Sequence, residues 1–193
     1  AQASPETIGP QRKRQRRETR RRMQRDRPSR ASGERSFDMP QIELRLGSRV
    51  RSMPLADFYL DYMKNQLEPG EFVQALRVPL DTSTTRQVRA YKISKRFDCD
   101  ISALCAGFSI DVQDGVVRDV RLAFGGMAAT VRRAAQAEAA LRGQPWTQAS
   151  VQAAQQALAH DFTPLSDMRA SAGYRLQVAQ NLLQRLWLET RSD

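Results

Sequence analysis

The regular part of the chain opens with alternating apolar and polar residues. Residues 42–46 alternate aliphatic and charged side chains, Gly47-Ser48 follows, and Val50 then stands between two arginines. Glycine at the first position of a two-residue loop favours a type II′ turn. Residues 42–51 are therefore predicted to form a β-hairpin.

The next segment is less regular. Residues 55–67 crowd aromatic side chains together and are expected to be a short helical or irregular stretch. Pro69-Gly70 breaks this stretch, and residues 71–78 are predicted to form a strand that Pro79 closes.

Longer apolar runs follow a polar link at residues 81–86. Residues 88–94, 103–112 and 116–124 are predicted to be strands, and Gln113-Asp114-Gly115 between the last two is a strong hairpin signal. The last two runs carry apolar residues on both faces, which indicates central strands partly covered by helices.

After Gly125-Gly126 the apolar period becomes that of helices. Three helices are predicted: residues 131–142 with Thr130 as cap and Gly143 as end, residues 148–159 capped by Thr147, and a last helix opened by Ser166 or Ser171. The last helix runs to Trp187, with an apolar repeat at Leu176, Ala179, Leu182, Leu183 and Leu186. Strands first and helices afterwards indicate an α+β fold, a small antiparallel sheet packed against C-terminal helices.

The net charge of +10 is unevenly distributed. Residues 1–41 hold 12 Lys/Arg and 5 Asp/Glu, whereas residues 42–193 hold 19 and 16. Residues 1–40 carry so little apolar surface that we expect a disordered or irregular basic arm. Most such charge blocks are solvated tails. The alternative is a nucleic-acid-binding or scaffold module that binds RNA or DNA through Arg12 to Arg35.

Few residues suggest chemistry by themselves. Cys99, Cys105 and the single His160 match no zinc or iron–sulfur spacing, so we expect reduced thiols and no metal site in this chain. With one histidine and no outstanding pair of acids, no catalytic residue is assigned. Apolar runs fall short of the roughly 20 residues that span a bilayer, and a secretory signal is missing, so we expect a cytoplasmic protein without a membrane partner.

One segment does point to a family. Tyr91-Lys-Ile-Ser-Lys-Arg-Phe-Asp-Cys-Asp-Ile-Ser-Ala103 resembles the signature of the flavoprotein C-terminal domain of molybdenum hydroxylases, and within them is most similar to the FAD-binding small subunits of xanthine dehydrogenases. Three further segments agree in the same order, at residues 58–72, 121–130 and 162–175. Together they cover residues 42–190. The resemblance implies that residues 41–80 are a remnant of the FAD-binding domain with its linker, and that residues 81–193 are the flavoprotein C-terminal domain.

The resemblance implies an oxidoreductase subunit. In this family a molybdenum cofactor on another subunit or domain oxidises a purine, electrons pass through 2Fe–2S clusters to FAD, and FAD gives a hydride to NAD. The expected partners are a molybdenum-binding large subunit and an iron–sulfur domain. A carbon monoxide or aldehyde dehydrogenase flavin subunit is the alternative within the superfamily, because the substrate is chosen on the molybdenum subunit.

The matching segments also imply cofactor-binding residues. Lys92 resembles the lysine that approaches the flavin ring, where a cation favours negative charge on the ring. Val73 is similar to an apolar residue that packs near the flavin. Arg96, Asp98 and Asp100 fall in the charged loop that the family places beside the ring. Cys99 departs from the pattern, since related sequences often carry an acid there.

A second departure concerns the flavin phosphates. Family members precede this domain with glycine-rich segments for the FAD pyrophosphate, and no such segment stands before Gln41. The N-terminal flavin-binding half is therefore expected to be missing and the FAD site incomplete. We expect this chain alone to bind FAD weakly or not at all.

Overall fold

The computed structural model describes residues 39–80, 83–97 and 100–191. The basic arm predicted over residues 1–40 lies outside the described residues up to position 38, as do Asp98 and Cys99. Residues 39–80 and residues 83–191 each hold a sheet, and each part is described by itself.

Residues 39–80 form an antiparallel sheet of three strands in the order β2-β1-β5. The strands are β1 (Gln41–Leu46), β2 (Arg49–Pro54) and β5 (Phe72–Arg77). Gly47, in the β1–β2 turn, has a φ of +58°, a left-handed conformation that glycine adopts without steric cost. The predicted hairpin and the strand predicted over residues 71–78 are both confirmed.

The connection from β2 to β5 holds helix α2 (Leu55–Phe58) and a short hairpin of β3 (Tyr59–Asp61) and β4 (Lys64–Asn65). Residues 55–67 were expected to be a short helical or irregular stretch; the structure has one turn of helix at Leu55–Phe58, and the small hairpin after it was not predicted. Three side chains form the core of this part and two more pack against them: Ile42, Leu44 and Phe58, with Met53 and Leu55.

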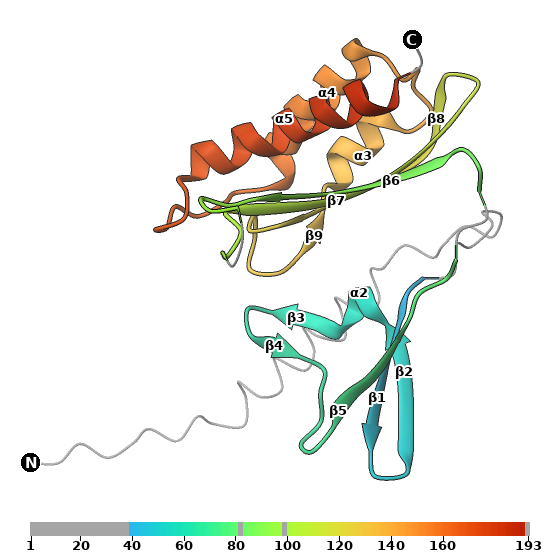
Figure 1. Ribbon diagram of the computed structural model, residues 1–193, viewed down its shortest axis with the longest axis vertical. Helices are drawn as coiled ribbons and strands as arrows, with labels where there is room; N and C mark the ends of the chain where they lie inside the picture. Colours follow the sequence, from blue (N-terminus) through green and yellow to red (C-terminus); the bar gives the residue numbers. More distant parts are fainter. Residues whose placement is uncertain (1–38, 81–82, 98–99, 192–193) are drawn as a thin grey trace, which may run out of the picture. The chain divides into compact units, whose positions relative to one another are not determined.

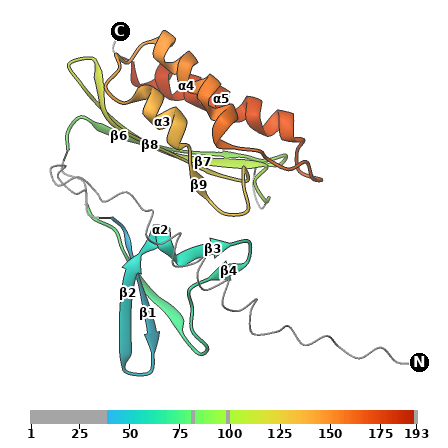
Figure 2. The same cartoon turned by 180° about the vertical axis from the view of Figure 1, so that it is seen from behind.

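Residues 83–191 form a four-stranded antiparallel sheet with helices on one face, as Figures 1 and 2 show from opposite sides. In order across the sheet, the strands are β6 (Arg86–Ile93), β7 (Leu104–Gln113), β8 (Val116–Gly125) and β9 (Arg132–Arg133). The helices are α3 (Ala135–Leu141), α4 (Gln148–Asp161) and α5 (Ala172–Thr190). The predicted α+β fold is confirmed.

The β7–β8 hairpin is the one that Asp114-Gly115 predicts. Asp114 and Gly115 have φ values of +51° and +72°, the pair of positive angles that a type I′ turn requires. The turn sets the register in which Ile110 pairs with Val120 and Phe108 with Leu122. All four of these side chains are buried, so the hairpin presents one continuous apolar face to the helices.

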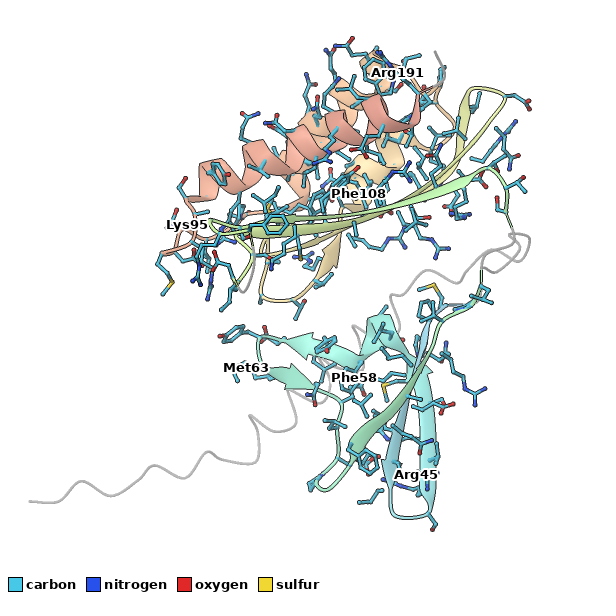
Figure 3. All side chains as sticks on the ribbon, in the orientation of Figure 1. Arg45, Phe58, Met63, Lys95, Phe108 and Arg191 are labelled. Atoms are coloured by element: carbon cyan, nitrogen blue, oxygen red, sulfur yellow. The ribbon has the colours of Figure 1, made fainter. Side chains whose placement is uncertain are left out.

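Aromatic rings join this sheet to the helical layer. Tyr91, Phe108, Phe124 and Phe162 follow one another edge to face, with centroid separations of 5.6, 5.2 and 5.5 Å. Phe108 lies between sheet and helices in Figure 3. Edge-to-face pairs at this spacing add to the stabilisation from buried apolar area.

None of the helices in the described part of the chain combines the length and the apolar character that a membrane-spanning helix needs.

The caps predicted for the last two helices are confirmed. The Thr147 hydroxyl accepts the Ser150 N–H while the Ser150 hydroxyl accepts the Thr147 N–H, a reciprocal capping box at the start of α4. Ser171 caps α5 by accepting the Tyr174 N–H at 3.2 Å.

The start predicted for the first helix is wrong. Arg132 and Arg133 pair with β8 as strand β9, and the Ala134 N–H donates to Leu122 O at 2.8 Å. The helix begins only at Ala135, and Thr130 does not cap it. Backbone groups of this segment are satisfied by the sheet, which outweighs the local helical pattern. The predicted end holds, since Gly143 follows the helix with a φ of +77°.

Candidate functional site

The sheet of residues 83–191 has one face that the helices leave uncovered, called the open face below. Tyr91 of β6 points to the helices, where its hydroxyl donates to Glu189 Oε2 at 2.8 Å. Successive side chains of a strand lie on opposite faces, so Lys92 lies on the open face. Cys105 of β7 stands opposite Lys92, and Gly125 of β8 stands opposite Cys105. These three residues form one row across the open face.

Lys92 brings a positive charge to this row. Its side chain is exposed, and within the residues that the structure describes its ammonium group has no hydrogen-bond or ion-pair partner. An ammonium group carries three donors, all of which remain available to a ligand.

The floor beside this row is made of small residues. Ala90, Gly107 and Ala123 form the neighbouring row across β6, β7 and β8. A Cβ added at Gly107 would meet no heavy atom within 4 Å, whereas one added at Gly125 would lie 2.5 Å from Cys105 Sγ. Because Gly125 has no Cβ, the Cys105 sulfur can occupy the space beside it. At Gly107 the space is open, so a flat group can approach the backbone closely.

The far end of the open face is occupied by its own charges. Arg86 donates to Asp119 Oδ2 at 3.0 Å and lies 3.8 Å from Asp111 Oδ2. Asp111 also accepts the Thr85 hydroxyl at 2.6 Å. These charges pair with one another, so the end that carries Lys92 is the candidate ligand surface.

Residues 94–102, called the charged loop, connect β6 to β7 next to Lys92. The Ala103 N–H donates to Ile93 O at 2.8 Å and closes the base of the loop. The Arg96 N–H donates to Asp100 Oδ2 at 3.1 Å, and the Arg96 guanidinium lies 3.8 Å from the same carboxylate. The Arg96 N–H is the main cause that lowers the pKa of Asp100, so this carboxylate stays ionised.

The remaining sequence-predicted residues lie elsewhere or outside the described residues. Asp98 belongs to the charged loop but is not among the described residues. Val73 lies in β5, opposite Leu44, with 43% of its surface exposed. The structure thus brings Lys92 together with the loop of Arg96 and Asp100, and places Val73 in the separate sheet of residues 39–80.

Sequence reasoning missed Cys105 as a neighbour of Lys92. The pairing of β6 with β7 depends on how many residues the charged loop contains, which the apolar pattern does not determine. A signal was present all the same: Cys105, Gly107 and Ser109 alternate with buried residues along β7, so this face of the strand carries only small side chains from Cys105 to Ser109.

The ring of FAD fits this surface better than its phosphates do. A flat floor beside an unpaired cation suits a planar ring that gains negative charge. The pyrophosphate of a dinucleotide is instead commonly held by a glycine-rich loop that leads into a helix. The N-caps of α3, α4 and α5 are Ala134, Thr147 and Ser171, and in the described part of the chain a glycine-rich loop leads directly into none of these helices.

Comparison with known proteins gives a consistent result. The family described as CO dehydrogenase flavoprotein C-terminal domain matches residues 89–190. A nicotinate hydroxylase of Emericella nidulans is 30% identical over 76% of this chain and 11% of its own length. A putative xanthine dehydrogenase FAD-binding subunit of Escherichia coli is 26% identical over 76% of this chain and 50% of its own length.

Solved structures agree with the sequences. The carbon monoxide dehydrogenase of Hydrogenophaga pseudoflava superposes with a TM-score of 0.69 at 27% identity, over 76% of this chain and 50% of that chain. The chain spans about half the length of the curated FAD-binding subunit that it matches, and about a tenth of the hydroxylase. The family match covers more than half of the chain. The chain belongs to the family of CO dehydrogenase flavoprotein C-terminal domains.

Proposed function

We propose that this chain forms the C-terminal wall of the FAD site in a xanthine dehydrogenase-type oxidoreductase. FAD, when bound, supplies the transfer of electrons from iron–sulfur clusters to NAD. One observation carries the proposal: the ammonium group of Lys92, which has no partner among the described residues, stands beside a floor of small residues in a chain of this family.

Each site residue has a physical role in this proposal. Lys92 stabilises negative charge on the ring through its own positive charge. Gly107 lets the ring approach the sheet closely, because its Cα carries no side chain and the space above it is open. The charged loop with Arg96, Asp98 and Asp100 tunes the local potential and the access of NAD, and Val73 packs against the ring from the other sheet.

The whole enzyme contains more than this chain. The chain spans 50% of the FAD-binding subunit from Escherichia coli, so the proposed site needs a flavin-binding half to hold the pyrophosphate. A molybdenum-binding subunit and an iron–sulfur domain complete the electron path in the proposed cytoplasmic complex. The resemblance of residues 91–103 to xanthine dehydrogenases favours a purine such as xanthine as the substrate.

The test combines this chain with a separately produced flavin-binding half of the Escherichia coli relative. Lys92→Met removes the cation and Lys92→Arg keeps it. Two unit charges in contact interact by about 1 kcal/mol in water and about 4 kcal/mol at an effective dielectric constant of about 20. For a two-electron couple this corresponds to a decrease of roughly 20–90 mV in the flavin midpoint potential of Lys92→Met.

The outcome is read from a reductive titration of the bound flavin. Lys92→Arg should retain a potential close to that of the unmodified protein. Equal potentials for Lys92→Met and Lys92→Arg would contradict the proposed role of the cation. If the mixture retained no FAD through gel filtration, the proposed site itself would be contradicted. Reduction of the bound flavin by NADH, followed by its absorbance, tests the acceptor separately.

A further inference from the structure

A single buried arginine contacts three of the four segments that carry the family resemblance. Arg175, only 4% exposed, lies in the first turn of α5. Its Nη1 donates to Ala103 O, directly after the charged loop. The same Nη1 donates to Gly126 O, just after β8, at 2.7 Å. Its Nη2 donates to Asp167 Oδ1 at 2.7 Å. The proposed function uses residues of the first two of these segments and leaves the third, residues 162–175, unexplained.

The position of Arg175 on its helix makes a charge unexpected. Arg175 shares one stripe of α5 with the buried residues Ala179, Leu182 and Leu186. A buried charge is expensive to desolvate, and an apolar side chain of similar size is often as stabilising. An arginine differs from an apolar side chain in what it fixes, because its planar guanidinium holds several acceptors in one geometry.

The acceptor that matters is the carbonyl of Ala103. The Ala103 N–H already donates to Ile93 O at 2.8 Å, so Arg175 fixes the second polar group of the same residue. Ile93 pairs with Leu104, one position along from the pair of Lys92 and Cys105. We propose that Arg175 is a positioning residue that fixes the base of the charged loop beside Lys92.

Asp167 holds the guanidinium in place. Its carboxylate accepts the N–H groups of Arg169 and Ala170 at 2.8 and 3.2 Å, in addition to Arg175. These donors, with the Arg169 N–H first, lower the pKa of Asp167 to about 2. The anchor of Arg175 is therefore ionised at any physiological pH. The loop itself makes a second contact with this segment, because Lys95 Nζ donates to Met168 O at 2.9 Å. Lys95 is labelled in Figure 3, at the end of the sheet.

Gly126 shows that the arrangement leaves no free space. Its φ is +82°, and a Cβ added there would lie 2.7 Å from Ala103 O and 3.0 Å from Arg175 Nη1. Gly126→Ala therefore pushes apart the donor and acceptor of the contact without removing any charge. Gly143 offers a matched control, because its φ is +77° and a Cβ there would meet nothing within 4 Å.

This role rests on the proposed function, because the charged loop serves a site only if Lys92 faces the flavin. Its test nevertheless needs no flavin. Hydrogen exchange of the full chain is measured by mass spectrometry for the unmodified protein, Arg175→Met, Arg175→Lys, Gly126→Ala and Gly143→Ala. The lysine of Arg175→Lys can still reach the two carbonyls but cannot bind Asp167 at the same time. Its exchange rates should therefore lie between those of the unmodified protein and of Arg175→Met.

The expected result is local. Amides of residues 94–102 should exchange at least about tenfold faster in Arg175→Met and Gly126→Ala, while amides at the centre of β7 and β8 stay within about twofold. Gly143→Ala should leave the loop unchanged, although it carries the same left-handed backbone cost. Uniform acceleration across the sheet, an unchanged loop, or a loop already unprotected in the unmodified protein would overturn the proposal. If Arg175→Met does not fold, Gly126→Ala and Arg175→Lys still decide the question.

A second readout connects the loop to the flavin. In the mixture with the flavin-binding half, Arg175→Lys and Gly126→Ala should shift the flavin midpoint potential, and Gly143→Ala should not. A loosened loop with an unchanged potential would show that Arg175 serves the fold alone and would overturn its role in the site. Failure of the proposed function is a separate result, seen as equal potentials for Lys92→Met and Lys92→Arg.

Discussion

Glu71 is a carboxylate that the sheet of residues 39–80 encloses almost completely. Its side chain is 1% exposed and accepts Arg51 Nε at 2.8 Å and Arg51 Nη2 at 2.6 Å. The N–H of Glu68 donates to the same carboxylate at 2.8 Å. Arg51, first among the causes, and the Glu68 N–H lower the pKa of Glu71 from 4.5 to about 2. The ionised carboxylate of Glu71 therefore links strand β2, through Arg51, to the turn before β5.

This lowered pKa predicts how the stability of the sheet depends on pH. The folded state binds fewer protons than the unfolded state between the two pKa values, 4.5 and about 2. The stabilisation is fully present above the unfolded value and is lost as the pH falls through the folded one. Glu71→Gln should flatten this loss in urea unfolding followed by circular dichroism between about pH 3 and 6. Glu68→Gln is the control: Glu68 is 51% exposed, and its pair with Arg49 should contribute little.

For single residues, the sequence predicts which side chains belong to the candidate site better than it predicts which residues contact them. Lys92 was identified from the segment that resembles the family, and its position on the uncovered face follows from strand alternation. Cys105 and Arg175 were not identified. The pairing of Cys105 depends on loop length, and the three partners of Arg175 come from segments far apart in the chain. An arginine on the apolar stripe of a predicted helix was the one local signal for the latter.

Among the elements, α4 depends most clearly on a local sequence signal. Thr147 accepts the Ser150 N–H and Ser150 returns a hydrogen bond to the Thr147 N–H. Thr147→Ala removes a cap and should lower the free energy of unfolding by about 1 kcal/mol. Thermal unfolding followed by circular dichroism measures this. Gln152→Ala shortens an exposed polar side chain inside the same helix and should cost little or nothing. A loss as large for Gln152→Ala would show that the cap is not responsible.

Elements whose ends are marked by turns or caps were predicted well, and those set by tertiary contacts were not. Gly47-Ser48 and Asp114-Gly115 fix two hairpins by backbone conformation, and Thr147 and Ser171 fix two helix starts by side-chain hydrogen bonds. Residues 131–134 instead follow the edge of β8, where the free ladder groups of a distant strand decide their conformation. The apolar period of residues 131–134 cannot indicate this pairing, because the edge belongs to a strand elsewhere in the chain.

At the scale of the whole molecule, the chain presents a wall rather than an enclosed site. The proposed ring-binding residues lie on the open face, whereas no described helix start offers a phosphate cradle. The chain alone is therefore expected to bind FAD weakly or not at all. Gel filtration after incubation with FAD, read by absorbance, measures this directly. Retention of one flavin per chain would contradict the expectation and would place the phosphate site within this chain.

An uncovered sheet face of small apolar residues also has a consequence for assembly. Antiparallel sheets that face water usually carry polar side chains on that face. The centre of the open face instead carries Ala90, Gly107 and Ala123, and the exposed Val88 lies beside them. The charge pairs described on this face gather around Asp111 and Asp119, which pair with Arg86 and, in the case of Asp119, with Arg121 as well. The centre is thus suited to close contact with the flavin and the half of the subunit that holds it.

Gly107→Leu tests that contact without disturbing the domain itself. A Cβ at Gly107 meets nothing within 4 Å, so the leucine should project from the open face and leave the core intact. It should keep the flavin and its half from the sheet, and weaken retention of FAD in the mixture at least about tenfold, or about 1.4 kcal/mol. Gly173→Leu places the same side chain in equally open space on α5 and should leave retention unchanged. Equal retention for both variants, measured by flavin absorbance after gel filtration, would mean that the ring lies against some other surface.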